Sequence, residues 1–284
     1  MILVPQRLFE DERVRTLMRI GNGCFLHKTL PEPTVDREGY VSNHAVSIVL
    51  AGEQRIRPHE APTFGARTGE VLLVPRGLYH ITDLLPERGT FQSLLCYFDD
   101  AAIHQFLART AVGELGRHAP PDHLHFGRRP DVLLFARTLL ELYGRSAGSN
   151  DALLPVKTQE LLHLLARAHG EAAFAHFLFG LTLPRKRRLV DFMERNFAKP
   201  LRVEDYARLT GRSLSSFRRD CLDQLGESPR RWLAARRIAL AKTLLRDAQR
   251  SIAEVAAEVG YVHTSNFTRA FRKHTGQPPG VWRR

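Results

Sequence analysis

The stretch that decides the fold is residues 251–284, SIAEVAAEVGYVHTSNFTRAFRKHTGQPPGVWRR. It opens with Ser251 and Glu254, the S-x-x-E pattern of a capping box, in which the two side chains bond free backbone N–H groups at a helix start. Apolar residues then recur with the spacing of one helix face up to Gly260, which is suited to the left-handed conformation that ends helices. A second amphipathic segment follows and stops at Gly276. The stretch therefore predicts a helix-turn-helix unit.

The same pattern occurs once more, about 50 residues earlier in the chain. At an offset of 50 the matches are Phe217 with Phe267, Arg219 with Arg269, Gly226 with Gly276, Pro229 with Pro279 and Trp232 with Trp282. Nearer the N-terminus the offset becomes 49, which pairs Gly211 with Gly260. In this first copy Arg202 replaces the capping Ser251, so we expect that helix start to be frayed or capped by other means. Ser213 is suited to cap the next helix. The repeat predicts two related units side by side.

A long helix is predicted between the two units. Pro229 to Asp247 contains no glycine and no internal proline, and Trp232, Ile238, Ala241 and Leu245 keep helical spacing. A helix of about 18 residues spans ~27 Å at 1.5 Å per residue. It can hold two recognition helices roughly one DNA turn apart, ~34 Å, on one side of a duplex. A plain helical bundle is the alternative, but it leaves the charge distribution of the chain without a reason.

That charge is concentrated in the same part of the sequence. The 284 residues carry 42 Lys+Arg and 30 Asp+Glu, a net charge of +12. Residues 185–284 hold 23 basic and 10 acidic side chains, and the other 184 residues hold 19 and 20. The 36 arginines and 6 lysines are also open to an explanation by genomic base composition. A neutral body with a basic end nevertheless indicates nucleic acid or an anionic membrane as the partner.

Several classes of protein are not expected. No apolar run approaches the ~20 residues of a membrane helix, and the acidic residues near the N-terminus do not fit a signal peptide. The three cysteines, Cys24, Cys96 and Cys221, are too scattered for a zinc knuckle or a disulfide framework. We therefore expect a cytoplasmic protein that needs no cofactor, metal or membrane.

The repeated units resemble the DNA-binding half of the AraC/XylS family of bacterial transcription regulators. The resemblance covers about residues 186–284 and rests on AAEVGY at 256–261, SNFTRAFR at 265–272, GQPP at 276–279 and Trp282-Arg283. It implies double-stranded promoter DNA and RNA polymerase as partners, with both recognition helices in the major groove. The implied base-contacting residues are Ser215, Arg218 and Arg219 in the first unit and Thr264, Ser265, Asn266 and Arg269 in the second. Arginine suits guanine and asparagine suits adenine in that groove.

Other residues of this half have different predicted roles. Ser213 and His263 stand at helix starts, where side chains and backbone N–H groups usually meet phosphate. Lys186 and Arg187 are candidates for phosphate contacts or for a solvated linker. Phe217, Phe267 and Cys221 are assigned to the core.

Residues 1–98 show the alternation of a β-rich domain, as in Val46, Ile48 and Leu50 before a turn at residues 51–53. The spacing G-x5-P-x-G-x2-H from Gly69 to His80 resembles the second motif of cupin barrels. The histidine pair and glutamate of the first cupin motif are missing, so a catalytic metal is not expected. Tyr79 and His80 are candidates for an effector pocket. Zinc is likewise not expected at His118, His123 and His125, because a proline-containing loop separates them.

Helical patterns follow at about residues 100–112, 131–145 and 152–180, and their leucines suit either a homodimer interface or packing on the barrel. We predict an α+β protein: a regulatory domain at 1–180, with a cupin-like barrel at about 1–98 and helices at about 100–180. A linker at 181–186 and a DNA-binding domain at 187–284 complete it. A cupin-like enzyme with a DNA-localising domain and a nonspecific architectural DNA protein are the alternatives.

Within the family, SPRRWL at 228–233 and Arg236-Arg237-Ile238 resemble the master activators of type III secretion. That resemblance implies an activator of virulence genes that is controlled by an anti-activator protein. A small-molecule effector is the other possible signal.

Overall fold

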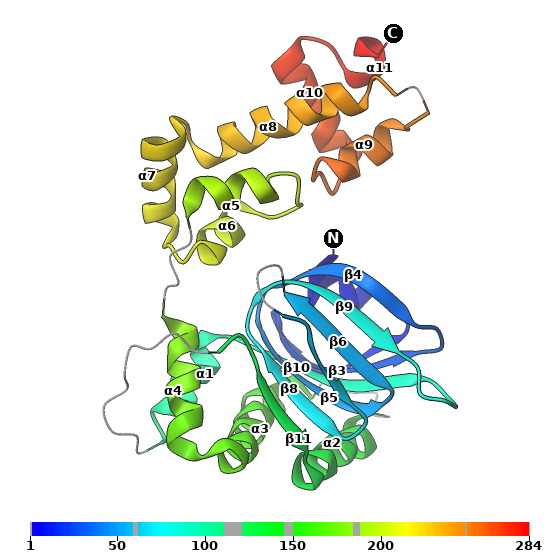
Figure 1. Cartoon of the computed structure of the whole chain (residues 1–284), viewed down its shortest axis with the longest axis vertical. Coiled ribbons are helices and arrows are strands. Elements are labelled where there is room, and N and C mark those ends of the chain that lie inside the picture. The colour runs from blue at the N-terminus through cyan, green and yellow to red at the C-terminus, as the bar shows by residue number, and fades with distance from the viewer. Residues whose placement is uncertain are drawn as a thin grey trace. The chain divides into compact units, whose positions relative to one another are not determined.

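The structure is a computed structural model that describes residues 2–58, 62–110, 121–144, 150–183, 188–247 and 249–283. It divides into two units, Met1–Leu183 and Pro184–Arg284 (Figure 1). The first is built from strands and helices and the second from helices, so the α+β class is confirmed. Among the described residues, no helix is both long and apolar enough to cross a membrane.

The first unit contains two β-sheets. One has the strand order β1 (Ile2–Val4), β4 (Thr34–Val41), β9 (Gly77–Leu84), β6 (Glu53–Pro58) and β7 (Phe64–Arg67). The other has the order β11 (Leu124–Arg128), β8 (Glu70–Val74), β5 (His44–Ala51), β10 (Phe91–Phe98), β3 (Gly23–Leu30) and β2 (Val14–Ile20). The strands pair antiparallel, except that β1 and β4 are parallel. No pairing of described residues joins the sheets, so the expected barrel is an open pair of sheets.

The central strand β5 is covered on both faces. Val46 and Ile48 pack into the cluster that includes the helices, whereas Ala45 and Val49 pack into the cluster between the two sheets. Alternation in the sequence predicted one buried face. The second face is also buried because the other sheet packs on it, which a local pattern does not reveal.

Among its described residues, the first unit has four helices, which pack on the side of the six-stranded sheet. They are α1 (Asp100–Leu107), α2 (Pro130–Tyr143), α3 (Leu154–His169) and α4 (Glu171–Thr182), with short 3-10 turns at Gln6–Glu10 and Asp151–Leu153. The helical stretch expected at 152–180 is two helices, because Gly170 has a φ of +93° and breaks it. Strand β11 was not expected in the sequence.

The second unit is the predicted tandem repeat. Its helices are α5 (Leu189–Asn196), α6 (Val203–Leu209), α7 (Leu214–Leu225), α8 (Pro229–Leu244), α9 (Ile252–Glu258), α10 (Thr264–Thr275) and α11 (Pro279–Trp282). Both second helices of the repeat end at a left-handed glycine, Gly226 with φ +74° and Gly276 with φ +80°. The long α8 runs between the first unit of the repeat and the second (Figure 1). The helix-turn-helix prediction is confirmed.

The helix starts of the repeat differ as the sequence indicated. Ser251 Oγ accepts the Glu254 N–H at 3.1 Å, and Glu254 Oε2 accepts the Ser251 N–H at 2.7 Å. In the first copy Asp205 supplies the cap instead, since its Oδ2 accepts the Arg202 N–H at 3.0 Å. The helix that lacks a capping serine is therefore capped from its third residue.

We predict that Ser251→Ala lowers the free energy of unfolding of the second unit by about 1 kcal/mol, because the Glu254 N–H loses its acceptor. Urea unfolding followed by tryptophan fluorescence measures this unit selectively, since the chain's two tryptophans, Trp232 and Trp282, both lie in it. Ser228 is the matched control: it precedes α8 with an extended backbone but makes no capping hydrogen bond. Equal losses in the two variants would contradict the capping role.

Candidate nucleic-acid interface

The two recognition helices, α7 and α10, each bury one face. Phe217 and Cys221 on α7 and Phe267 and Phe271 on α10 are completely buried. The members of each pair are four residues apart, so they lie on the same side of their helix. Burial raises the pKa of the Cys221 thiol to about 11, and the thiol is therefore neutral in the core. The core assignments made from sequence are confirmed.

The opposite face of both helices is open to solvent. All seven predicted base-contacting side chains are exposed: Ser215, Arg218, Arg219, Thr264, Ser265, Asn266 and Arg269. Arg269 Nη2 donates to Asn266 Oδ1 at 3.2 Å, so two of them are already held together without DNA. Because the apolar residues occupy the inner face, these polar residues share the face that a major groove can receive.

The predicted phosphate contacts have different surroundings. Ser213 is exposed at the start of α7, and its Oγ accepts the Ser216 N–H at 3.2 Å. His263 precedes α10, is also exposed, and makes no capping bond through its side chain. Lys186 and Arg187 lie outside the described residues. The phosphate roles of all four stay predictions.

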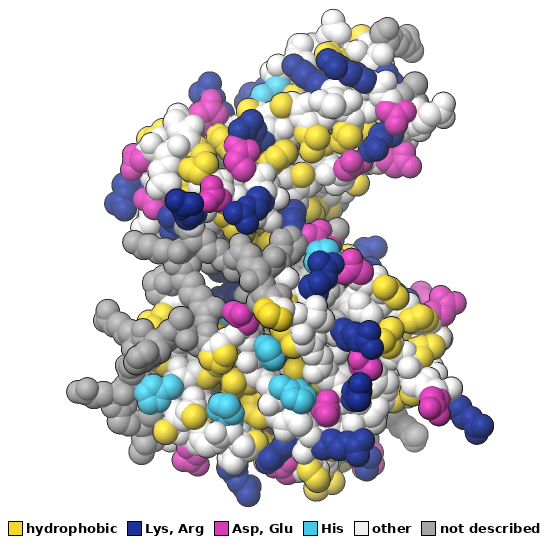
Figure 2. Space-filling view, viewed as in Figure 1, with side chains coloured by type: hydrophobic (Ala, Val, Ile, Leu, Met, Phe, Trp, Pro, Cys, Tyr) yellow, Lys and Arg dark blue, Asp and Glu magenta, His cyan; other side chains and the backbone are white. Residues whose placement is uncertain are grey.

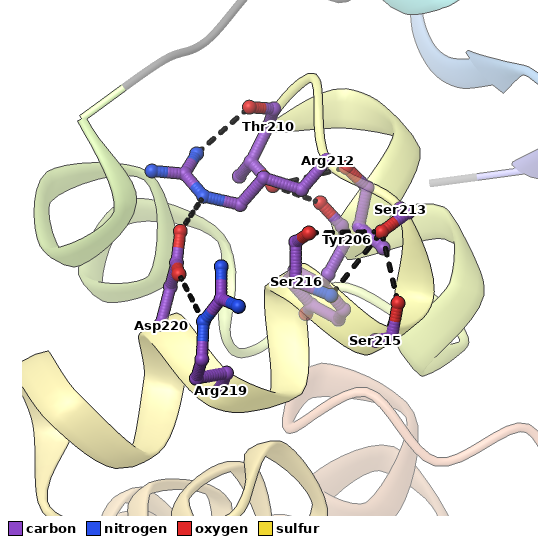
Figure 3. A network of polar contacts seen from close by, with 9 residues as sticks. Tyr206, Thr210, Arg212, Ser213, Ser215, Ser216, Arg219 and Asp220 are labelled. Carbon is purple, nitrogen blue, oxygen red and sulfur yellow. Dashed lines mark hydrogen bonds and ion pairs between the residues drawn. The ribbon is translucent and has the colours of Figure 1, made fainter.

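A buried arginine, Arg212, holds the turn of the first helix-turn-helix unit against recognition helix α7 (Figure 3). Arg212 Nε donates to Asp220 Oδ2 at 2.8 Å, and Arg212 Nη1 donates to the Thr210 carbonyl at 2.8 Å. The Arg212 side chain is 8% exposed, whereas the Arg219 side chain is 73% exposed and has a 3.8 Å contact with Asp220 Oδ1. Within this helix-turn-helix unit, Arg212 therefore has a structural role, whereas Arg219 is exposed to solvent.

The two recognition helices differ in charge. Helix α7 carries two arginines and two aspartates, Asp220 and Asp223, while α10 carries Arg269, Arg272 and Lys273 without an acid. An open hollow runs along α10 beside Thr268, Arg272, Lys273 and Gly276. Thr268, Arg272 and Lys273 were not singled out in the sequence, although Arg272 and Lys273 follow Arg269 by three and four residues and so lie one turn further along the helix. Lys and Arg side chains are visible on the exposed surface in Figure 2.

The unit that contains the β-sheets, Met1–Leu183, has a second candidate site. It is a cavity of about 60 Å³ lined by residues of both sheets. Tyr79 lines it, and its hydroxyl donates to the Pro75 carbonyl at 2.8 Å. His80 is not a lining residue: it is the next residue of β9, and its Nδ1 lies 3.3 Å from Asp36 Oδ1. Consecutive strand residues point to opposite faces, so the structure separates the two predicted pocket residues.

The cavity wall contains a buried polar cluster that the sequence did not indicate. Lys28 forms an ion pair with Asp83, which is fully buried, and Gln54 Nε2 donates to Asp83 Oδ1 at 2.8 Å. Ser47 Oγ and Gln54 Oε1 are buried without a hydrogen-bond partner among the described residues. Such groups are costly unless a water or ligand satisfies them. The cavity can therefore accept a molecule with a hydrogen-bonding group.

Histidines gather on the visible face of the first unit (Figure 2). His123 stacks on Phe64 with ring centroids 3.6 Å apart, and His125 Nε2 lies 3.2 Å from Glu70 Oε2. His118 is outside the described residues. Within the described ranges, no three metal-ligating side chains come together in a site for an ion.

Comparisons with known proteins match both halves of the chain. A helix-turn-helix domain model matches residues 206–284, and the ExsA N-terminal regulatory domain matches residues 44–177. The transcriptional regulator ExsA of Pseudomonas aeruginosa is 29% identical over 82% of this chain and 84% of its own length. The thermoregulatory protein LcrF of Yersinia pestis is 29% identical over 76% and 80%. VirF of Yersinia enterocolitica, a virulence regulon transcriptional activator, is 28% identical over 84% and 88%.

Among solved structures, apo ToxT of Vibrio cholerae covers 93% of this chain and 98% of its own, at 12% identity and a TM-score of 0.44. That score is too low to carry a structural comparison.

We predict that Arg212→Ala lowers the free energy of unfolding of the second unit by roughly 2 kcal/mol, because a partly buried ion pair and a turn carbonyl lose their donor. Arg218→Ala is the control with the same loss of charge, and its exposed position predicts a change within about 0.5 kcal/mol. Urea unfolding followed by tryptophan fluorescence compares them. If Arg218→Ala were the more destabilising change, the structural role of Arg212 would be wrong.

Proposed function

The chain belongs to the AraC/XylS family of transcription regulators, and on that premise we propose that it activates transcription with both recognition helices on one promoter. The observation that carries the proposal is the shared design of α7 and α10. Each buries an apolar pair and exposes a polar arc containing the predicted base-contacting residues. Two such arcs in one chain suit two successive major-groove segments.

We propose that the polar arcs read bases and that the helix starts contact the phosphate backbone. Arg218 and Arg219 would bind guanine through their paired donors, and Asn266, held by Arg269, would bind adenine. Ser213 and His263 would approach phosphate, with Lys186 and Arg187 adding charge at the start of the domain. The positive charge of α10 suits it to draw the protein to DNA.

The relatives support a wider proposal about the genes that the protein controls. We propose an activator of virulence genes that recruits RNA polymerase, because VirF is described as a virulence regulon activator and ExsA and LcrF also match most of the chain. The resemblance at residues 228–238 extends this proposal to type III secretion genes. Since its target is promoter DNA, we place the protein in the cytoplasm. We keep 1–180, 181–186 and 187–284 as regulatory domain, linker and DNA-binding domain.

We also propose a homodimer formed through helices of the regulatory domain. Most leucines of α2 and α3 pack inside the unit, but Leu134, Leu142 and Val156 are 67%, 58% and 62% exposed. Large apolar side chains on neighbouring helices are the kind that association buries. They support an interface in which the inward leucines hold the helices and the outward residues meet the second copy.

The proposed signal is a small molecule bound in the cavity between the sheets. Tyr79 belongs to the lining, and the unsatisfied Ser47 hydroxyl and Gln54 carbonyl would bond the molecule's polar group. Control by an inhibitory partner protein is the rival, and such a protein would co-purify with the regulator. His80 is retained only as a control position.

The enzyme alternative is not favoured, because both matching family models describe regulatory or DNA-binding domains. It predicts stoichiometric iron or zinc in the purified protein, which elemental analysis measures. The architectural alternative predicts equal affinity for unrelated duplexes at one salt concentration. Competition against random DNA distinguishes that case from a specific regulator.

We predict that Arg219→Ala and Arg269→Ala each weaken operator binding by about 1–3 kcal/mol and relax discrimination at one base pair. Genome-wide mapping of binding sites supplies the operator, and titrations against single-base variants measure the discrimination. Lys186→Ala is the control. If Lys186 contacts phosphate, its loss would weaken binding to all sequences evenly and flatten the salt dependence of binding. Operator binding equal to that of the parent in both arginine variants would show that the base-contacting register is wrong.

For the cavity, we predict that a thermal-shift screen finds a small-molecule ligand, since a ligand at 100 times its Kd stabilises the folded state by about 2.7 kcal/mol. Gln54→Leu should abolish that shift by removing the polar group that faces the ligand. His80→Ala should leave it intact, because His80 is outside the cavity lining. The cavity assignment fails if the ligand's shift depends on His80 and not on Gln54.

A further inference from the structure

Arg237 lies within the long helix α8 and contacts both helix-turn-helix units. Its Nε donates to the Phe197 carbonyl at 2.7 Å, and its Nη2 donates to the Lys199 carbonyl at 2.7 Å. Both acceptors belong to the loop between α5 and α6, in the first unit. Its Nη1 donates to the Gly260 carbonyl at 3.1 Å, just after α9 in the second unit. One guanidinium thus bonds three carbonyls from segments on either side of α8 in the sequence.

The two helix-turn-helix units also approach each other directly through their backbones, at Gly260 and Ala198. Gly260 has a φ of +89°, and a Cβ at this position would lie 2.5 Å from the Ala198 carbonyl oxygen and 2.9 Å from its carbon. Only a residue without a side chain permits that approach. The turn that ends α9 therefore rests on the loop that follows α5, at the point where Arg237 bonds both.

Tyr206 also holds the loop of the first helix-turn-helix unit. Tyr206 is fully buried, and its hydroxyl donates to the Asn196 carbonyl at 2.7 Å, at the end of α5. On the second-unit side, the guanidinium carbon of Arg237 lies 5.6 Å from the centre of the Tyr261 ring. Both segments that Arg237 joins therefore have a further contact with an aromatic side chain, Tyr206 on one side and Tyr261 on the other.

A helix alone does not set the geometry of two units attached to its ends. Helix α8 has 16 residues, or about 24 Å of length, which fixes a distance along one axis. The rotation of each unit about that axis needs contacts away from the helix. Arginine suits this role because its planar fork of donors is rigid, and hydrogen bonds from a charged donor are roughly twice as strong as neutral ones.

We propose that Arg237, seated against Gly260, is a positioning residue that sets the spacing and rotation between the two operator half-sites that this regulator accepts. The inference rests on the proposed function, in which α7 and α10 read one operator together. With the joint intact, binding of one helix presents the other at high effective concentration to its own half-site. With the joint loosened, each helix still reads its half-site, but the pair tolerates other spacings.

The test compares Arg237→Ala with the parent on three duplexes: the mapped operator, the operator with one base pair inserted between the half-sites, and the operator with one half-site scrambled. One inserted base pair rotates a half-site by about 35°. We expect the insertion to weaken DNA binding by the parent about 30-fold and DNA binding by the variant less than about 3-fold. The variant should bind the operator about 10-fold more weakly and the scrambled duplex within about 2-fold of the parent.

Arg236→Ala is the matched control, since it removes the same charge from the next residue of α8. Arg236 forms an ion pair with Glu194 and is about half exposed, and it has no hydrogen bond or ion pair with the described residues of the second helix-turn-helix unit. Arg236→Ala should therefore lose as much affinity as the parent does when one base pair is inserted; we call this loss the spacing penalty. Arg237→Gln has a shorter side chain with donors on one nitrogen, so it cannot reproduce three bonds that come from three nitrogens. It should relax spacing as alanine does, and it serves if the alanine variant does not fold.

Different results would contradict the positioning role of Arg237 and the proposed two-helix reading of DNA. Equal weakening of Arg237→Ala on all three duplexes, with the spacing penalty retained, would overturn the positioning role, as would the same relaxation in Arg236→Ala. If the parent itself bound the scrambled and intact operators equally, the two-helix reading of the proposed function would fail instead. A parent that is sensitive to spacing and a variant that is not support the proposal.

Discussion

The buried residue pairs of the recognition helices determine what the rest of the second unit can do. A helix that commits residues four apart to the core has only its opposite face for a partner. Phe217 and Cys221 make that commitment in α7, and Phe267 and Phe271 make it in α10. The left-handed glycines that end both helices and the Ser213 cap that starts α7 position these faces. The joint at Arg237 and Gly260 then relates one face to the other.

The first unit follows a different principle, since its central sheet is buried on both sides. Helices cover one face and a second sheet covers the other, so polar groups between the sheets need partners inside the protein. Lys28, Asp83 and Gln54 supply one another with partners. The Ser47 hydroxyl and the side-chain oxygen of Gln54 have no hydrogen-bond partner among the described residues in the same cavity. A region built for burial therefore keeps a place with unused hydrogen-bonding capacity, which supports the effector site that we propose.

Sequence predicted the second unit well because its determinants are local. The Ser251 cap, the terminal glycines and the apolar spacing all act within one or two turns of helix. The role of Arg237 could not be predicted, because its acceptors lie 23 to 40 residues away in the chain. Likewise the motif around Tyr79 indicated the strands but not how they divide between two open sheets. The cupin-like spacing made both Tyr79 and His80 candidates for the pocket, although alternation along a strand separates their side chains.

The unequal charge of α7 and α10 gives the chain a direction. Two identical readers related by symmetry would match a palindrome and bind it equally in either orientation. Here a neutral helix and a strongly basic one follow each other in a single polypeptide. If both helices read DNA as we propose, the operator segment bound by one chain would have a head and a tail, and reversing that segment would turn the chain around on the DNA. Its orientation relative to the transcription start would then be information that the promoter carries, in addition to its base sequence.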